Sequence, residues 1–512
     1  MRQIFHIFKK DVRRHWIEIL FSTAALTLYT WHEIHSWKPK RFDSLRFWPA
    51  TVFFLLFIAW WVLIVRLIQG ESLAGDRQFW TTRPCEWKCL LAAKASFILA
   101  FVNVPLAIAQ VFLLLKAGFP PTLQWFWLLW LHLLMLCVPL SPIMALATVT
   151  RNISQSLLAL LGVVLLMAGL LAFTLTVGEP AFAYSADWLM ALVLAIVSVM
   201  AIGLQYVRRK TSIARIILGI GGGMIVLITT LVPSLTEGMD IPAFSGTTEL
   251  PSLQAELLPQ PLPQDETLDE KDKVEVVIPM AISGLPKGFL AQGQGVMLTA
   301  RTPDGGFWRS KWIPVYQFFL PGTNNLGLNF SIERKIFEKI RFAPAAIEIS
   351  FATKIFQSSN EEVVVVATDQ TFPVPRTGMC WLDSGYRDGI KCLAPFFQPV
   401  SVFVRVEPSE STCPIAEGGR QSKGELHGWQ WATDTDFPDY GFSPVQSFGF
   451  DLTGYDGKSP ERALICPGSP LHFSFPQFIR RTRAEFKFNG IKLEQYRYVG
   501  LGFHLVLRKS DR

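Results

Sequence analysis

The chain changes character at about Pro233: long apolar stretches precede it, and a polar, strand-rich sequence follows. A helix needs roughly 20 mostly apolar residues to cross a bilayer, and the first half supplies several such stretches in succession. Half of all residues are hydrophobic and the mean hydropathy is +0.31, which is high for a soluble globular protein. The sequence therefore predicts an α-helical polytopic membrane domain of about six or seven transmembrane helices, followed by a mainly-β, β-sandwich-like domain.

Four segments follow from this pattern. They are an amphipathic interfacial helix at residues 1–15, a transmembrane domain at 16–233, a linker rich in proline and acid at 234–273, and a β-rich domain at 274–512. In the first segment, helical spacing separates an apolar side from a charged side, as in helices that lie in the membrane interface. The apolar side is expected to hold Ile4, Phe5, Ile7, Phe8 and Val12, and the charged side Lys9, Lys10, Asp11, Arg13 and Arg14. The alternative is a charge cluster that only sets orientation.

Seven spans are expected within the transmembrane domain. Their approximate limits are Trp16–Ile34, Phe47–Ile68, Ala95–Leu115, Leu123–Thr148, Ser156–Val177, Trp188–Tyr206 and Ile213–Pro233.

The basic residues indicate how the chain is oriented. Residues 1–233 hold 20 Lys and Arg against 9 Asp and Glu, whereas the remainder holds 28 against 32, so the positive excess belongs to the membrane half. Most of it lies in alternate loops, which places the N-terminus in the cytoplasm and, after seven spans, the β-rich domain outside. We read this excess as a topology signal and not as a nucleic-acid-binding surface.

The loop from Glu71 to Lys94 is the longest one expected inside. Pro84 is suited to the first turn of a helix that leads into the third span. In such a helix Arg83, Glu86 and Lys88 would face water and Trp87 would lie on an apolar side. A short amphipathic helix on this face is a docking surface for a partner protein, and an ordinary basic connector is the alternative.

The order of these parts resembles the permease subunit of type-2 ATP-binding-cassette (ABC) exporters. That family also begins with an interfacial helix and has a coupling helix between its second and third spans. The run Phe79-Trp80-Thr81-Thr82-Arg83-Pro84, followed by Leu90-Leu91 and Lys94, resembles the family's entry into the third span. The run from Ala145 to Asn152 resembles the end of its fourth span. The resemblance covers roughly residues 1–233.

The resemblance implies a membrane-spanning permease that exports an unknown substrate from the bacterial inner membrane. It implies a dimer of identical or different permease chains in the lipid bilayer, driven by a separate ABC ATPase subunit. Arg83, Glu86, Trp87 and Lys88 are then the residues expected to couple to that ATPase. The family usually has six spans with both termini inside; either one of the seven stretches is re-entrant, or an extra span carries the second half outward.

No phosphate-binding GxxxxGK[ST] loop occurs in the sequence, so we expect ATP to bind in the partner subunit and no cofactor in this chain. The glycine cluster Gly219–Gly223 lies inside the last expected span, where glycine permits close helix packing or bending. No catalytic set, GxSxG motif or metal-ligand spacing is present, so the chain itself is not expected to be an enzyme.

The second half opens with a linker that carries five prolines and then five acidic residues, a composition typical of an extended spacer. Candidate strands then follow at Val274–Ile282, Gly295–Arg301, Ile347–Phe356, Glu362–Ala367 and Val400–Val406. Asn489-Gly490, between two short strand-like segments, predicts a type I′ hairpin. We expect one or two sandwich-like modules.

Four of the seven cysteines lie in this half: Cys380, Cys392, Cys413 and Cys466. An even number in a domain placed outside the cell membrane fits disulfides. Cys380–Cys392 is the first pairing to expect, because the turn residues between them can reverse the chain, and Cys413–Cys466 would then follow. Three connectivities are possible, and reduced core cysteines are the alternative.

Two other functions stay open. The alternative to an exporter is a membrane receptor or scaffold whose outer β domain binds a partner without transport, although seven spans exceed what an anchor needs. A membrane enzyme with its site in the β domain is a weaker possibility, since no site is visible in the sequence.

Overall fold

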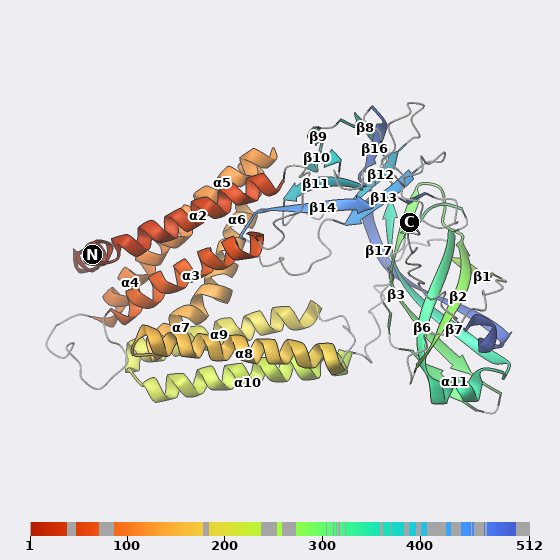
Figure 1. Cartoon of the computed structure of the whole chain (residues 1–512), viewed down its shortest axis with the longest axis horizontal. Helices are drawn as coiled ribbons and strands as arrows, with labels where there is room; N and C mark the ends of the chain where they lie inside the picture. The colour runs from red at the N-terminus through yellow and green to blue at the C-terminus, as the bar shows by residue number, and fades with distance from the viewer. Residues whose placement is uncertain are drawn as a thin grey trace, which may run out of the picture.

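A computed structural model of the chain shows helices in the first half and strands in the second, in that order (Figure 1). It describes residues 2–37, 48–70, 86–177, 184–236, 253–258, 273–303, 305–310, 312–313, 315, 318–322, 324–358, 362–368, 370–382, 389–395, 401–406, 426–431, 442–451, 453–454, 465 and 468–497.

The helical half consists of the following elements: α1 (Arg2–Arg14), α2 (Trp16–Ser36), α3 (Trp48–Gln69), α4 (Trp87–Ile98), η2 (Leu99–Asn103), α5 (Val104–Ala117), α6 (Pro121–Met135), η3 (Leu136–Leu140), α7 (Ser141–Val149), α8 (Ile153–Val177), α9 (Tyr184–Arg208) and α10 (Thr211–Thr236). Each expected span coincides with one of these helices or with a continuous run of them.

Five helical stretches of the described chain are long and apolar enough to cross a membrane: Thr51–Gln69, Trp87–Ala117, Pro121–Val149, Leu189–Arg208 and Thr211–Ile228. The two other expected spans are also helical. α2 is less apolar, and α8 has an apolar stretch from Ile153 to Leu166.

Two of these stretches are single long helices that each contain a π segment. Trp87–Ala117 joins α4, η2 and α5, and Pro121–Val149 joins α6, η3 and α7. Pro139 lies inside η3, and Pro105 follows η2 in the first turn of α5. Proline lacks an N–H and its ring crowds the preceding turn, so a locally widened helix accommodates it.

The glycine cluster in α10 allows close contact with α9, as the sequence predicted. A Cβ atom built on Gly221 would lie 2.6 Å from Cγ1 of Val197 on α9. A Cβ on Gly219, Gly222 or Gly223 would meet nothing within 4 Å. Only Gly221 of this cluster is therefore needed for the helix contact.

The strand half contains two modules, one inserted into the other. The first has a three-stranded sheet in the order β1-β2-β6 and a five-stranded sheet, in which β17-β7-β3-β4 pair in that order and β5 also pairs with β3. Its elements are β1 (Gln254–Leu257), β2 (Lys273–Ser283), β3 (Phe289–Arg301), β4 (Phe307–Arg309), β5 (Phe318–Phe319), β6 (Asn324–Glu333), α11 (Arg334–Ile340), β7 (Ala345–Gln357), β17 (Gln477–Ile491) and η4 (Leu493–Tyr496).

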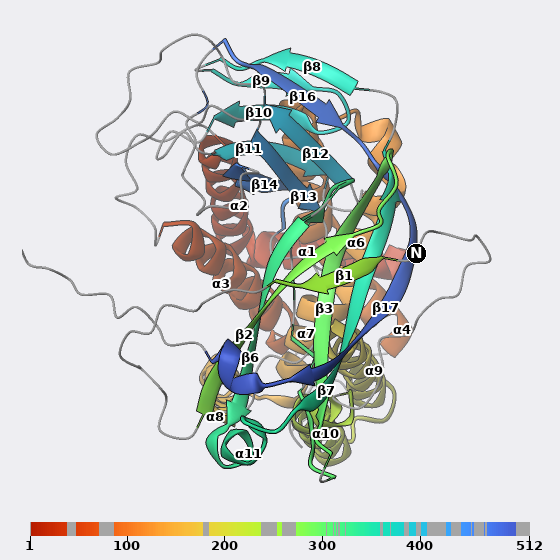
Figure 2. The same cartoon turned by 90° about the vertical axis from the view of Figure 1, so that its right-hand side faces the viewer.

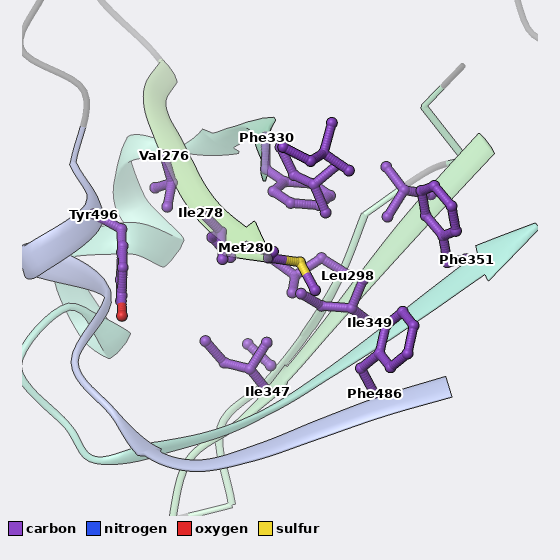
Figure 3. Close-up of a cluster of buried hydrophobic side chains, with 14 of the residues drawn as sticks. Val276, Ile278, Met280, Leu298, Phe330, Ile347, Ile349, Phe351, Phe486 and Tyr496 are labelled. Carbon is purple, nitrogen blue, oxygen red and sulfur yellow. The ribbon is translucent and has the colours of Figure 1, made fainter. Parts of the chain in front are cut away.

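A hydrophobic core fills the first module. Val276, Ile278 and Phe330 of one sheet meet Leu298 and Ile349 of the other (Figure 3). Alternate residues of these strands are apolar and buried, which is the pattern that sandwich strands require.

The second module lies between β7 and β17 in the sequence and beside the first in space (Figure 2). Its sheets have the orders β14-β11-β10-β9 and β15-β13-β12-β16-β8. The strands are β8 (Glu362–Val366), β9 (Phe372–Val374), β10 (Gly378–Leu382), β11 (Gly389–Pro395), β12 (Ser401–Val406), β13 (Leu426–Trp431), β14 (Val445–Asp451), β15 (Thr453–Gly454) and β16 (Pro470–Ser474).

Cys380 and Cys392 are directly opposite each other on β10 and β11 and form the expected disulfide pair. Both side chains are fully buried in the core of the second module. Cys413 and Cys466 lie outside the described residues, so their pairing stays a prediction.

The hairpin expected at Asn489-Gly490 was wrong. Gly490 has the positive φ, 75°, that such a turn needs, but β17 continues through it. Phe488 pairs with Ile347 and Ile491 with Ala345, so two residues of β17, Asn489 and Gly490, stand opposite one of β7, Ala346. The same backbone conformation therefore produces a β-bulge instead of a turn.

The segment expected as a spacer is partly ordered into the first module. β1 falls within it and pairs antiparallel with β2, from Gln254↔Ser283 to Leu257↔Met280. Ala255 and Leu257 pack against the core while Gln254 and Glu256 are exposed, so four alternating residues suffice to add an edge strand.

The α9–α10 contact gives a first prediction. Gly221→Leu should lower the stability of the helical half by about 1–3 kcal/mol, because the new side chain overlaps Val197. Gly223→Leu is the matched control, since it makes the same change where nothing lies nearby. Thermal unfolding of both purified variants in one detergent measures the difference, and equal melting temperatures would contradict the close packing.

Candidate functional site

Several helix termini gather at one end of the helical bundle, which we call the basic end. Arg14 Nη1 donates to the carbonyl of Gly70 at 3.1 Å, which joins the end of α1 to the end of α3. Gln69 Nε2 donates to Thr150 Oγ1 at 2.9 Å, and Arg215 Nη2 donates to the Val149 carbonyl at 2.8 Å. The ends of α3 and α7 and the start of α10 are thereby fastened together.

The segment expected to couple to a partner lies at this end. Arg83 lies outside the described residues. Glu86 is the residue before α4, and Trp87 and Lys88 form the exposed beginning of its first turn. Lys88 Nζ lies 5.8 Å from the centre of the Trp87 ring, a cation–π contact.

Trp87 and Lys88 do not form a separate amphipathic helix in the loop. In the described residues, Trp87 and Lys88 belong to the same continuous helix that runs to Ala117. Leu90 is buried against the bundle, whereas Trp87, which was expected on the apolar side, is exposed. The structure thus keeps Glu86, Trp87 and Lys88 together on an exposed helix start, and whether they bind a partner stays a prediction.

A buried ion pair fixes α1 to α4 next to this segment. Lys94 Nζ lies 2.8 Å from Asp11 Oδ2, and the two side chains are 4% and 2% exposed. A paired charge this deep requires close geometry, since leaving either partner alone would cost several kcal/mol. Lys94 is expected at the end of the loop that begins at Glu71, and no partner is expected for it.

Aromatic contacts extend the junction between α1 and α4. Phe8 meets Phe97 of α4 edge-on at 6.1 Å and stacks on Phe101 of η2 at 5.9 Å. His15, at the junction of α1 and α2, packs edge-on against Phe97 at 6.4 Å. Burial lowers the pKa of His15, against the opposing effect of Glu18 and Asp11. α1 is thus packed onto the start of the third span rather than lying free.

One sequence signal could have revealed the ion pair. Asp11 lies three and seven positions from Phe8 and Ile4, on the apolar side of α1 and not on its charged side. An acidic residue on the apolar side of a helix needs a buried partner, and Lys94 occupies the matching position in α4.

The opposite end of the bundle contacts the second β module (Figure 1), and we call it the β-capped end. The helix that begins at Trp87 reaches this end at Ala117. A Cβ on Gly378 of β10 would lie 2.5 Å from the Phe119 ring, so the strand and the helix end approach closely. The contact consists of Trp37, Leu113, Leu114, Ala117, Phe119, Trp381, Leu393 and Val445.

Alternation along β10 and β11 gives the second module two distinct faces. Cys380 and Cys392 point into its own core, while the next residues, Trp381 and Leu393, point to the helices. The disulfide therefore ties together the two strands that carry the contact with the bundle.

The described residues show no group of three or more His, Cys, Asp or Glu side chains that could hold a metal ion. His132 of α6, a polar residue within an expected span, lies with Nδ1 3.3 Å from Asn103 Oδ1 of η2. The contact between His132 and Asn103 joins the helix that contains α6 to the helix that contains η2.

No protein-family model matches the chain, and no curated protein matches it.

The Asp11–Lys94 pair gives a second prediction. Lys94→Met should lower the unfolding free energy by about 3–5 kcal/mol, because it leaves the Asp11 carboxylate buried without a partner. The double change Asp11→Leu with Lys94→Met should recover most of that loss, since neither charge remains. Thermal unfolding in detergent is the measurement.

Lys9→Met is the control, because Lys9 is exposed on the other side of α1. A double variant as unstable as the Lys94 single variant would show that the pair is not what holds α1 in place.

Proposed function

We propose that the chain is the permease subunit of an ABC-type exporter, powered by a separate ATPase subunit. The observation that carries this proposal is the exposed start of α4 at the basic end, because the same helix continues without interruption to the β-capped end. A force applied at Trp87 and Lys88 would act directly on a rigid element that touches both ends of the bundle.

The buried pair makes α1 part of that element. Because Lys94 holds Asp11, a displacement of the first turns of α4 carries the interfacial helix with it. Closure of the ATPase subunits against residues 83–88 would therefore move α1 and the third span together and rearrange the bundle between its inward-open and outward-open states.

The proposed orientation places the basic end in the cytoplasm. Arg151, Arg208, Arg209 and Lys210 join the residues of that end, and such an excess marks the cytoplasmic side of membrane proteins. Seven spans would then bring the β modules to the other side of the bacterial inner membrane, where the Cys380–Cys392 disulfide is favoured.

The partners follow from the same proposal: two permease chains, identical or different, and ATPase subunits that carry the phosphate loop absent from this sequence. The β modules would contact the exported substrate or gate its exit at the β-capped end.

Co-purification gives the third prediction. The tagged full-length protein, isolated in mild detergent from its own host, should bring with it a chain that has a phosphate loop, in stoichiometric amount and with ATPase activity. Repeated isolation alone or with non-ATPase partners would overturn the permease proposal and favour a receptor.

Charge reversal at the coupling segment gives the fourth prediction. Lys88→Glu should reduce substrate- or permease-stimulated ATP hydrolysis by at least about tenfold, since one lost ion-pair or cation–π contact of about 1.4 kcal/mol corresponds to that factor. Lys210→Glu is the matched control, because Lys210 is also exposed at the basic end but lies between α9 and α10. Equal ATPase rates in both well-folded variants would remove Lys88 from the coupling site.

A further inference from the structure

Phe442, just before β14, extends from the second β module into the helical bundle. It is 3% exposed and belongs to the core of the helices rather than to the core of its own module. Its ring lies 4.9 Å from Phe53 and 4.7 Å from Trp60, both on α3, and 6.0 Å from Tyr29 on α2. We call these three aromatic residues with Gln110 of α5 the aromatic pocket.

The pocket lies well inside the bundle. Tyr29 and Gln110 each precede the last residue of their helix by about two turns, or roughly 10 Å. Trp60 lies further along α3, roughly 18 Å from its first residue. The segment from Phe442 to Val445 thus reaches to a depth at which an expected span would already be surrounded by hydrocarbon.

Polar groups of the helices receive the backbone of this segment. Gln110 Nε2 donates to the Phe442 carbonyl at 2.9 Å, and the Tyr29 hydroxyl hydrogen-bonds with the backbone of Phe442 and Ser443. Ser443 Oγ donates to the Val445 carbonyl at 2.8 Å, which holds the segment in a tight turn beside Glu33 of α2. Each of these polar side chains sits among apolar ones, where an unsatisfied polar group is costly.

The side chain of Gln110 can still accept a hydrogen bond. Its side chain is fully buried, and its Oε1 atom has no hydrogen-bond partner among the described residues. A glutamine amide has both an acceptor and donors, so it can bind the C=O and the N–H of a peptide at the same time. In the present arrangement only the donor is used.

An anchor would need apolar contacts and partners for its own backbone, but it would have no use for the vacant acceptor of Gln110. The aromatic pocket instead combines an aromatic cage for one side chain with a donor for its carbonyl and an acceptor still vacant. Those are the requirements for recognising an aromatic residue within an extended peptide.

We propose that the aromatic pocket is a binding site for a peptide segment bearing an aromatic side chain, and that Phe442–Val445 occupies it as the chain's own ligand. On the proposed exporter function, this names the substrate class as a peptide; the binding site itself does not depend on an ATPase. An external peptide competes with a tethered one whose effective concentration is in the millimolar range, so the resting chain has low apparent affinity.

The test uses the purified full-length chain in detergent and the probe acetyl-Phe-Ser-Pro-Val-amide, whose sequence is that of residues 442–445. Phe442→Ala should bind the probe at least about tenfold more tightly than the unmodified chain, because the internal competitor loses its aromatic side chain. Adding Gln110→Leu to that variant should abolish most of the gain. Acetyl-Ala-Ser-Pro-Val-amide should not bind.

Equal affinity of the unmodified and Phe442→Ala chains, or equal binding of the two probes, would overturn the proposal and leave Phe442 as an anchor. No ATPase is present in this assay, so a negative result is separate from failure of the permease proposal.

A second measurement does not require Phe442→Ala to fold. Ser443→Cys should react slowly with a soluble maleimide, because position 443 is buried, and saturating aromatic probe should raise the rate at least about tenfold by displacing the segment. The parent chain, labelled in parallel, corrects for its native cysteines. A rate unchanged by the aromatic probe would overturn the proposal.

Discussion

The constraint on which this molecule depends is that a bilayer offers no hydrogen-bond partners to the backbone. Every segment at that depth must be helical, except where other protein groups satisfy its N–H and C=O groups. The described helices obey this rule, and Phe442–Val445 is the instructive case: it is non-helical where it meets them, and Gln110 and Tyr29 supply its backbone partners. Irregular chain inside the bundle therefore has to be matched by buried polar side chains.

The same constraint bears on the proposed function. Since loops do not pass through hydrocarbon, a movement at one end of the bundle would have to reach the other end along the helices. The helix from Trp87 to Ala117 joins the two ends, and its π segment at Leu99–Asn103 is the place where its hydrogen bonding changes. Asn103, within that segment, also contacts His132, so the irregular turn is linked to the next long helix.

The sequence was most informative where one residue pattern has one structural meaning. Long apolar runs predicted the helices, and the turn-forming residues between Cys380 and Cys392 predicted the disulfide. The glycine cluster predicted close helix packing, but only the structure shows that Gly221 provides it and that α9 is the partner. Gly490 misled because a hairpin turn and a β-bulge both use a positive φ, and only the pairing of β17 with β7 separates them.

Contacts between residues far apart in the sequence could not be predicted from the local residue pattern. Asp11 and Lys94 are 83 positions apart, and Gln110 and Phe442 are 332 positions apart. The residue types around Phe442 are those of an ordinary loop, with Gly441 before it and Pro444 after it, and nothing local indicates burial among helices. Its location becomes evident only when the aromatic residues of α2 and α3 are seen around it.

The insertion of one β module within the other has a consequence for the order in which the chain folds. β7 and β17 are paired along nearly their whole lengths, yet Thr353 and its neighbour Thr482 are separated by 129 positions. Synthesis proceeds from the N-terminus, so all strands of the second module are made before β17 exists. The disulfide-bearing module can therefore close while the first still lacks a strand of its sheet, and completion of the enclosing module is the last step in assembly of the strand half.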